Sequence, residues 1–166
     1  MDLTVDAWGH ASWNGRALRA ALGRAGVASA KREGDHKTPA GSFPMRQVLY
    51  RPDRLAAPAT RLPVRALTPA DGWCDAPEDP NYNRLVELPY GASHEVLWRE
   101  DEIYDLVVPL GYNDDPVVPG LGSAIFLHVA RADWSGTEGC VALARAELLA
   151  VLAEVDPTSR VVVSGA

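Results

Sequence analysis

The sequence predicts a mainly β fold with one helix packed on it, an α+β class. Its 14 glycines and 13 prolines are spread along the chain and divide it into many short segments, as in β-rich proteins. Only residues 144–157 have the clear period of a helix. The predicted order is strands and long loops, then the helix, then a last strand, which differs from the βαβ repeat of a parallel sheet.

The N-terminal part is expected to contain short strands joined by turns. Residues 16–27 are ambiguous, because their alanines permit a helix while the flanking glycines fit a strand equally well. The other elements expected here are strands at 3–7 and 45–51, a hairpin region at 9–15, and turn chemistry at 32–43, with Gly34, Asp35, Pro39 and Gly41.

Residues 52–85 are rich in proline and aspartate and have little hydrophobic pattern. Long irregular loops in compact domains are often functional, so we expect a surface excursion that forms a lid or a cleft wall. Trp73 and Tyr82 lie in this loop and are candidate substrate-binding residues. Aromatic side chains of this kind can equally pin a loop to the core.

The C-terminal part contains the strongest patterns. Residues 123–130, SAIFLHVA, form a continuous apolar run that is typical of a strand buried on both faces. Residues 101–113 and 160–165 each predict a further strand. In the predicted helix, Asp156-Pro157 supplies the end signal, and one face carries Leu148, Leu149, Leu152 and Val155.

Length and composition indicate one globular domain over residues 1–166. Apolar residues make up 47% and charged residues 23% of the chain, the net charge is −6, and no basic block stands out, so nucleic-acid binding gains no support. No run reaches the eighteen or so apolar residues of a membrane span, and the first ten residues lack the features of a secretory signal. The histidines lack metal-ligand spacing, and no metal or cofactor is expected.

The stretch HVARADWSGTEGCVAL, residues 128–143, contains the candidate chemistry. A cysteine thiol attacks as its thiolate, and an imidazole can take the thiol proton. His128 ends the apolar run SAIFLH, and Cys140 begins CVAL, so a hairpin-like return would bring the two side chains together. The backbone N–H groups of Gly139 and Cys140 are candidate oxyanion donors.

The same residues also have an ordinary structural interpretation. His128 fits a hydrogen-bonded core histidine, and Cys140 fits a small buried apolar residue, as free cysteines often do. One cysteine and one histidine are a weak signal on their own. Cys74 has no histidine near it in sequence and is not expected to be the nucleophile. A disulfide between Cys74 and Cys140 would disable the site, so none is expected.

Four motifs in this order resemble the L,D-transpeptidase catalytic domain, the YkuD or ErfK/YbiS/YcfS/YnhG family. They are KTPAGSF (37–43), similar to the family's TPxGxF segment, YDLVVPLGYND (104–114), GLGSAIFLH (120–128) and TEGCVAL (137–143). The resemblance extends over about residues 3–163. It implies a β-sandwich with the C-terminal helix packed on it, a Cys140 nucleophile and a His128 base.

The sequence differs from the family pattern at two positions near the cysteine. The histidine usual before Gly-Cys is Glu138 here, and Ala142 replaces an arginine or asparagine. The loop from His128 to Cys140 is also shorter than is common. These features resemble a divergent branch with TEGC in place of SHGC. This branch is associated with cross-links from L-Ala to diaminopimelate (1,3-type) rather than the 3,3-type.

The resemblance implies an enzyme that acts on peptidoglycan stem peptides in the periplasm or cell envelope, without a cofactor. Cys140 would form an acyl-enzyme, which an amine of a second stem would resolve into a cross-link. The alternatives are resolution by water, as in an L,D-carboxypeptidase or endopeptidase, and a non-catalytic peptidoglycan-binding module. We expect a backbone carbonyl within residues 129–135 to orient His128.

Five further residues are candidate substrate contacts, each with an ordinary alternative. Arg131 can hold a substrate carboxylate or be a solvated loop arginine. Thr137 can hydrogen-bond near the site or shape the turn, and Glu138 can hold the amine of an acceptor or point to solvent. Tyr112 and Asn113 are expected at the same rim, or in an ordinary turn.

Overall fold

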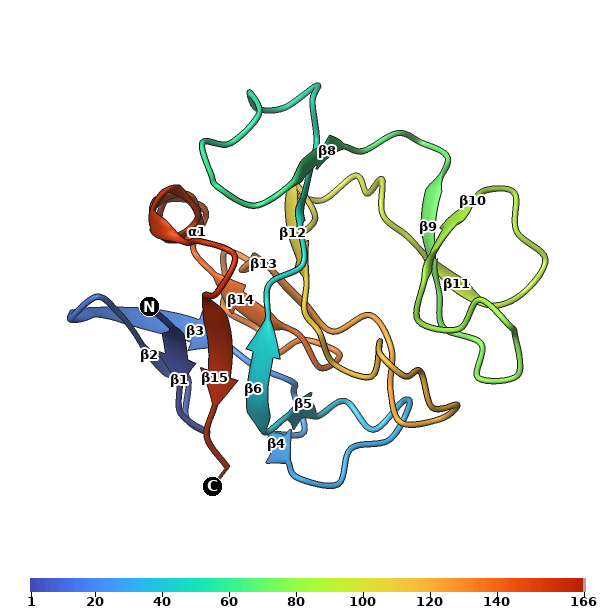
Figure 1. Cartoon of the computed structure of the whole chain (residues 1–166), viewed down its shortest axis with the longest axis horizontal. Coiled ribbons are helices and arrows are strands. Elements are labelled where there is room, and N and C mark those ends of the chain that lie inside the picture. The colour runs from blue at the N-terminus through green and yellow to red at the C-terminus, as the bar shows by residue number, and fades with distance from the viewer. Residues whose placement is uncertain (166) are drawn as a thin grey trace.

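A computed structural model describes residues 1–165 of the chain (Figure 1). It is mainly β with one helix, as the sequence predicts. The helix is α1 (Arg145–Glu154). The strands are β1 (Leu3–Val5), β2 (His10–Trp13), β3 (Arg16–Ala21), β4 (Val27–Ala28), β5 (Thr38–Pro39), β6 (Gly41–Pro44), β7 (Val48–Tyr50), β8 (Val64–Ala66), β9 (Asp71–Cys74), β10 (Leu85–Glu87), β11 (His94–Val96), β12 (Leu106–Pro109), β13 (Phe126–Val129), β14 (Val141–Leu143) and β15 (Arg160–Val163).

Ten strands form one sheet, in the order β6-β15-β1-β2-β3-β14-β13-β12-β7-β8. The sheet folds back on itself, because a bridge between Met45 and Leu110 connects the region after β6 to the end of β12. Buried side chains from both halves form one core, to which Trp13, Leu127 and Val161 contribute. The two halves therefore act as the layers of a sandwich (Figure 1).

Helix α1 covers one side of this core. Leu148, Leu152 and Val155 are fully buried against it, while Leu149 is only partly buried. Val151 is also fully buried, although it was not assigned to the apolar face from the sequence. The helix stops before Asp156-Pro157, as the sequence predicts.

A segment left open between helix and strand, and a segment expected as turns, both contain strands. The ambiguous segment 16–27 begins with strand β3, which pairs with β2 through a turn at Asn14-Gly15. Residues 38–44, expected as turn chemistry, form β5 and β6. Proline is tolerated in β6 because that strand lies at the edge of the large sheet, where it pairs only with β15.

The long segment 52–85 is not wholly irregular, contrary to expectation. It includes β8 and β9, and β9 is the centre of a separate three-stranded sheet with β10 and β11. Trp73, on β9, packs edge-on against Phe126 of β13, with ring centroids 5.1 Å apart. This contact fixes the small sheet over the face of β13 that is turned away from the sandwich core.

Asp105 anchors the start of β12. It is only 1% exposed, and its carboxylate pairs with Arg54 at 2.7 Å and with Arg145, the first residue of α1. The Arg54 guanidinium also donates to the carbonyls of Glu100 and Asp101. One buried charge thus connects the turn after β7, the segment before β12 and the helix.

We predict that Asp105→Ala destabilises the fold by about 3 kcal/mol, because it leaves two arginines without their shared partner. Urea denaturation followed by tryptophan fluorescence measures this loss. Asp114→Ala is the matched control, since Asp114 pairs with Arg46, whose side chain is 46% exposed. Equal midpoints for the two variants would contradict the anchoring role.

Candidate active site

The parallel pairing of β13 with β14 brings the candidate nucleophile and base to one face. Leu127 is paired with Val141 and His128 with Ala142, so Cys140 lies beside Phe126. Side chains alternate along a strand, and Phe126, His128 and Cys140 therefore share a face. The expected hairpin-like return is wrong, because the strands are parallel. Residues 130–139 instead carry the chain back to the start of β14.

The Cys140 thiol is held by backbone groups. It is 5% exposed, its Sγ donates to the Ala124 carbonyl at 3.2 Å, and it accepts from the Phe126 N–H at 3.4 Å. Ala124 has a left-handed φ of 54°, which is uncommon for a residue other than glycine. The Asn83 side chain fixes this conformation by accepting from the Ala124 N–H at 3.0 Å. Asn83 thereby positions the group that orients the thiol.

His128 is held by one hydrogen bond and by an aromatic contact. Its Nδ1 lies 2.9 Å from the Val129 carbonyl, within the segment expected to supply the orienting carbonyl. Because a carbonyl only accepts, Nδ1 carries the hydrogen and Nε2 keeps its lone pair. The Tyr104 ring packs edge-on against the imidazole, with centroids 5.3 Å apart. His128 is only 3% exposed, and this packing leaves it little freedom to rotate.

Burial holds both groups in their neutral forms. It raises the pKa of the Cys140 thiol to about 12, and the nearby Glu95 carboxylate adds to the shift. Burial also lowers the pKa of His128 to about 4. The resting site is therefore a neutral thiol beside a neutral imidazole, and not a preformed thiolate–imidazolium pair.

Residues 137–140, the catalytic loop, are braced by the Thr137 hydroxyl. It donates to the Cys140 carbonyl at 2.7 Å and accepts from the Gly139 N–H at 3.1 Å. The N–H of Gly139, a candidate oxyanion donor, is therefore already engaged in the resting structure. Gly139 has a φ of 143°, and a Cβ there would lie 2.9 Å from the Lys37 carbonyl oxygen, so glycine is required.

Glu138, which replaces the family's histidine, forms a cluster with Arg24 and His36. Arg24 donates to one Glu138 oxygen at 2.9 Å and to His36 Nε2 at 3.0 Å, while His36 Nδ1 contacts the other carboxylate oxygen. An arginine cannot accept, so Nε2 is the acceptor and Nδ1 bears the hydrogen. These contacts balance the charge of Glu138 and connect the catalytic loop to residues 31–37.

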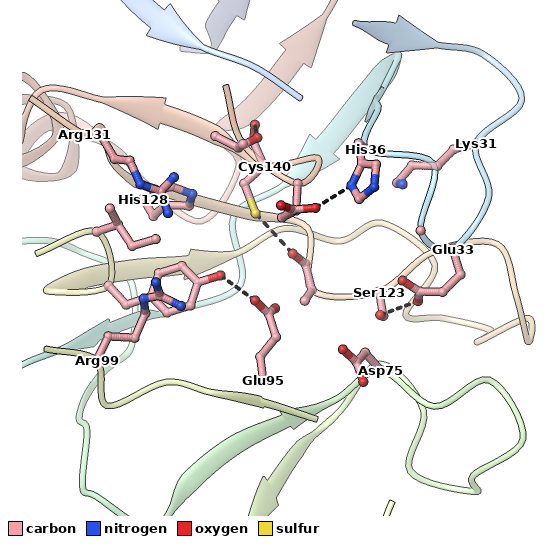
Figure 2. A pocket seen from close by; sticks show the side chains of 16 residues that line it. Lys31, Glu33, His36, Asp75, Glu95, Arg99, Ser123, His128, Arg131 and Cys140 are labelled. Atoms are coloured by element: carbon pink, nitrogen blue, oxygen red, sulfur yellow. Dashed lines mark hydrogen bonds and ion pairs between the residues drawn. The ribbon is translucent and has the colours of Figure 1, made fainter. Parts of the chain in front are cut away.

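Cys140 and His128 line a cavity of about 270 Å³. Figure 2 shows His128 and Arg131 to the left of the Cys140 sulfur, Glu95 below it, Asp75 and Glu33 to its lower right, and His36 and Lys31 to its upper right. The lining residues are Lys31, Glu33, Gly34, His36, Asp75, Glu95, Arg99, Ile103, Tyr104, Ser123, Ala124, His128, Arg131, Thr137, Glu138 and Cys140. The carboxylates of Glu33, Asp75 and Glu95 thus form an acidic side of the pocket, and basic residues lie at separate places around it.

Four predicted contact residues do not line this pocket. Trp73 and Tyr82 are buried and serve as anchors: Trp73 Nε1 donates to Asn83, and the Tyr82 hydroxyl donates to Glu33 at 2.7 Å. The Tyr112 hydroxyl donates to the Leu121 carbonyl, and Asn113 donates to the carbonyls of Val118 and Gly122. Packing and hydrogen bonds to other residues of the chain occupy these side chains. Cys74 is buried with Ala76 and Val86, away from the pocket.

Many polar residues that line the pocket were not predicted from the sequence. Lys31, Glu33, Asp75, Glu95 and Arg99 come from two segments outside the predicted strands. One local signal was present in KREGD, where Lys31 donates to Asp35 at 2.8 Å in a tight turn. The other three come from the region around the small sheet, whose position over β13 depends on tertiary contacts.

The family comparison matches residues 9–163 to the YkuD L,D-transpeptidase catalytic domain. This span covers nearly the whole chain, and the chain therefore belongs to this family. No curated protein and no solved structure gave a match. Within residues 1–165 the structure holds no helix with the length and apolar character needed to cross a bilayer.

We predict that alkylation of Cys140 by iodoacetamide keeps accelerating from pH 7 to 9.5, because a thiol with a pKa of about 12 stays mostly protonated over this range. Intact mass spectrometry of a Cys74→Ala background measures the rate. The His128→Gln variant should give the same profile, since no ion pair exists to be lost. A plateau below pH 7 that His128→Gln abolishes would instead indicate a preformed thiolate.

Proposed function

We propose that this domain is a cysteine-dependent L,D-transpeptidase that cross-links peptidoglycan stem peptides. The main observation behind the proposal is that the Cys140 thiol and the His128 imidazole lie on the same face of the sheet and line the same pocket. Family membership supplies the substrate class. A purely structural role for His128 does not explain why its Nε2 is left without a hydrogen bond and faces the pocket that contains the thiol.

Acylation begins with attack of Cys140 on the carbonyl of an L-centre followed by a D residue. His128 Nε2 takes the thiol proton as the carbon–sulfur bond forms, then gives it to the departing amine. Transfer during attack suits a neutral pair, because neither charge exists before the substrate arrives. The Cys140 N–H is the proposed oxyanion donor, and Gly139 contributes once its bond to Thr137 lengthens.

The acyl-enzyme is then resolved by the amine of a second stem peptide. We propose an L-Ala donor and a diaminopimelate acceptor, the 1,3-type link, on the strength of the TEGC sequence. Attack by water in place of the amine makes the same site a carboxypeptidase or endopeptidase. Enclosure of the thiol and imidazole by the pocket supports the amine reaction, because it limits the access of water.

Arg131 is the proposed contact for a substrate carboxylate. It is exposed, it lines the pocket on the His128 side, and it forms no ion pair within residues 1–165. An unpaired guanidinium can bind a carboxylate through two parallel hydrogen bonds. Thr137 and Glu138 support the catalytic loop in this proposal, because other residues of the chain already occupy their polar atoms.

This function places the domain in the periplasm or cell envelope, where peptidoglycan is found. Its partners are the donor and acceptor stem peptides, and its cellular role is cell-wall organisation and the maintenance of cell shape. The proposal requires no metal or cofactor. A polypeptide partner is not needed, because the nucleophile and base come from one chain.

We predict that the protein forms new dimers from purified muropeptides and that Cys140→Ala abolishes them. Liquid chromatography with mass spectrometry measures the products, and fragmentation identifies the donor residue. His128→Gln should lower the rate by at least about 100-fold, the usual range for loss of a general base. Shortened monomers without dimers would indicate a hydrolase. Equal products from the wild type and Cys140→Ala would overturn the catalytic proposal.

We predict that Arg131→Gln raises KM for the stem peptide about tenfold, because it removes one charge-assisted contact, with a smaller effect on kcat. Initial rates of dimer formation at several substrate concentrations measure both constants. Arg84→Gln is a suitable control, since Arg84 is also exposed but does not line the pocket. An unchanged KM would show that Arg131 is only a solvated loop residue.

A further inference from the structure

The three carboxylates on the acidic side of the pocket, Glu33, Asp75 and Glu95, are oriented by hydroxyl groups and not by ion pairs. Each carboxylate there is held by a hydroxyl: Tyr104 donates to Glu95 at 3.0 Å, Tyr82 and Ser123 donate to Glu33 at 2.7 and 2.5 Å, and Ser93 donates to Asp75 at 2.6 Å. None of the three forms an ion pair within residues 1–165. The acidic side is thus oriented but not ion-paired.

The catalytic pair supplies an independent indication that a ligand enters here. His128 is buried apart from its pocket-facing side, and its Nε2 has no hydrogen-bond partner within the described residues. The Tyr104 ring that packs against this imidazole carries the hydroxyl that orients Glu95. The base and the carboxylate are therefore positioned by one side chain, and both line the pocket that contains the thiol (Figure 2).

We propose that Glu95 binds the primary amine of the acceptor and that it, and not Glu138, selects an amine over water. This inference rests on the proposed function. Glu138 is unsuited to this role because Arg24 and His36 already occupy its carboxylate. Glu95 has no such partner, since the nearest guanidinium, that of Arg99, is paired with Asp101 at 2.7 Å.

The chemistry of the acceptor gives Glu95 a defined task. A primary amine is mostly protonated near neutral pH, and only its neutral form attacks a thioester. Burial raises the pKa of Glu95 to about 7, so this carboxylate can bind an ammonium group and also take its proton. A fully exposed carboxylate, with a pKa near 4.3, would be a much weaker proton acceptor.

Aminolysis of the acyl-enzyme moves two protons from the acceptor nitrogen. The ammonium gives one proton to Glu95, and its nitrogen attacks the thioester carbonyl carbon of acylated Cys140. The carbon–sulfur bond breaks as the amide forms, and the sulfur leaves as a thiolate. The second proton on the nitrogen passes through His128 Nε2 to this thiolate. Glu95 finally releases its proton to solvent, so the net products are the amide, the free thiol and one proton.

The test is the fate of the acyl-enzyme in Glu95→Gln. We expect the acyl-enzyme, measured by intact mass, to form at least as fast as in the wild type, because the Glu95 charge opposes ionisation of the Cys140 thiol. The ratio of dimers to hydrolysed monomers should fall about tenfold through loss of one charge-assisted contact. With an amino acid amide as a simple acceptor, the amine concentration for half-maximal aminolysis should rise. Hydrolysis measured without amine should be unchanged.

Two further variants separate this role from a structural one. Tyr104→Phe keeps the ring against His128 and removes the hydroxyl that orients Glu95, so the dimer ratio should fall in the same direction but less. Glu87→Gln makes the same change at an exposed position of β10 and should behave as the wild type. Thermal melting should show Glu95→Gln at least as stable as the wild type, because it removes a partly buried charge.

Different results would contradict the role of Glu95 and the proposed transpeptidase function. An unchanged dimer ratio in Glu95→Gln, with normal wild-type cross-linking, overturns the role of Glu95 alone. Equal slowing of acylation and dimer formation also overturns it, because Glu95 would then act on the donor or on the fold. If the wild type forms neither an acyl-enzyme nor products, the proposed function fails.

Discussion

The parallel register between β13 and β14 is the constraint on which the rest of the site depends. It places Leu127, Val129, Val141 and Leu143 in the sandwich core and turns Phe126, His128 and Cys140 to the opposite face. A slip of β13 by one residue would turn Leu127 and Val129 away from this core and the His128 imidazole into it. The hydrophobic core therefore fixes the spacing of nucleophile and base, and the catalytic geometry and the stability of the sheet have the same cause.

Burial of the catalytic face makes the charged forms of its side chains unfavourable. His128 and Glu95 both have pKa values shifted toward their neutral forms, to about 4 and about 7. Their effects on stability have opposite signs. Stability from neutral His128 is lost as the pH falls below its unfolded pKa of about 6.5, whereas stability from protonated Glu95 is lost as the pH rises from about 4.3 through 7. Near pH 7 the site thus keeps a neutral base beside a half-ionised carboxylate, and such balances are typical of functional sites.

Local patterns could predict the sandwich half of the site but not its acidic side. The apolar run ending at His128 and the Gly-Cys pair have strong sequence signals, and both lie where the pattern indicates. The direction of β14 was predicted wrongly, because the connection over residues 130–140 is long enough for either a hairpin or a return to a parallel partner. Glu95 had no signal, since it lies on a short half-buried strand whose place over β13 depends on Trp73 and Phe126. Asn83 likewise looks like an ordinary turn residue, and three of its four side-chain hydrogen bonds exist only after residues 71–84 and 112–124 have met.

The three-stranded sheet belongs to the stretch between β7 and β12, whereas Cys140 and His128 belong to the strands that follow it. Trp73 packs against Phe126, and Asn83 bonds to Ala124, so this stretch is joined to the sandwich beside the thiol. One continuous piece of sequence thus carries two of the three acidic residues, and another carries the reactive thiol. The pocket therefore exists only once the two pieces have docked, and a change that loosens this contact would disturb recognition and the orientation of the thiol together.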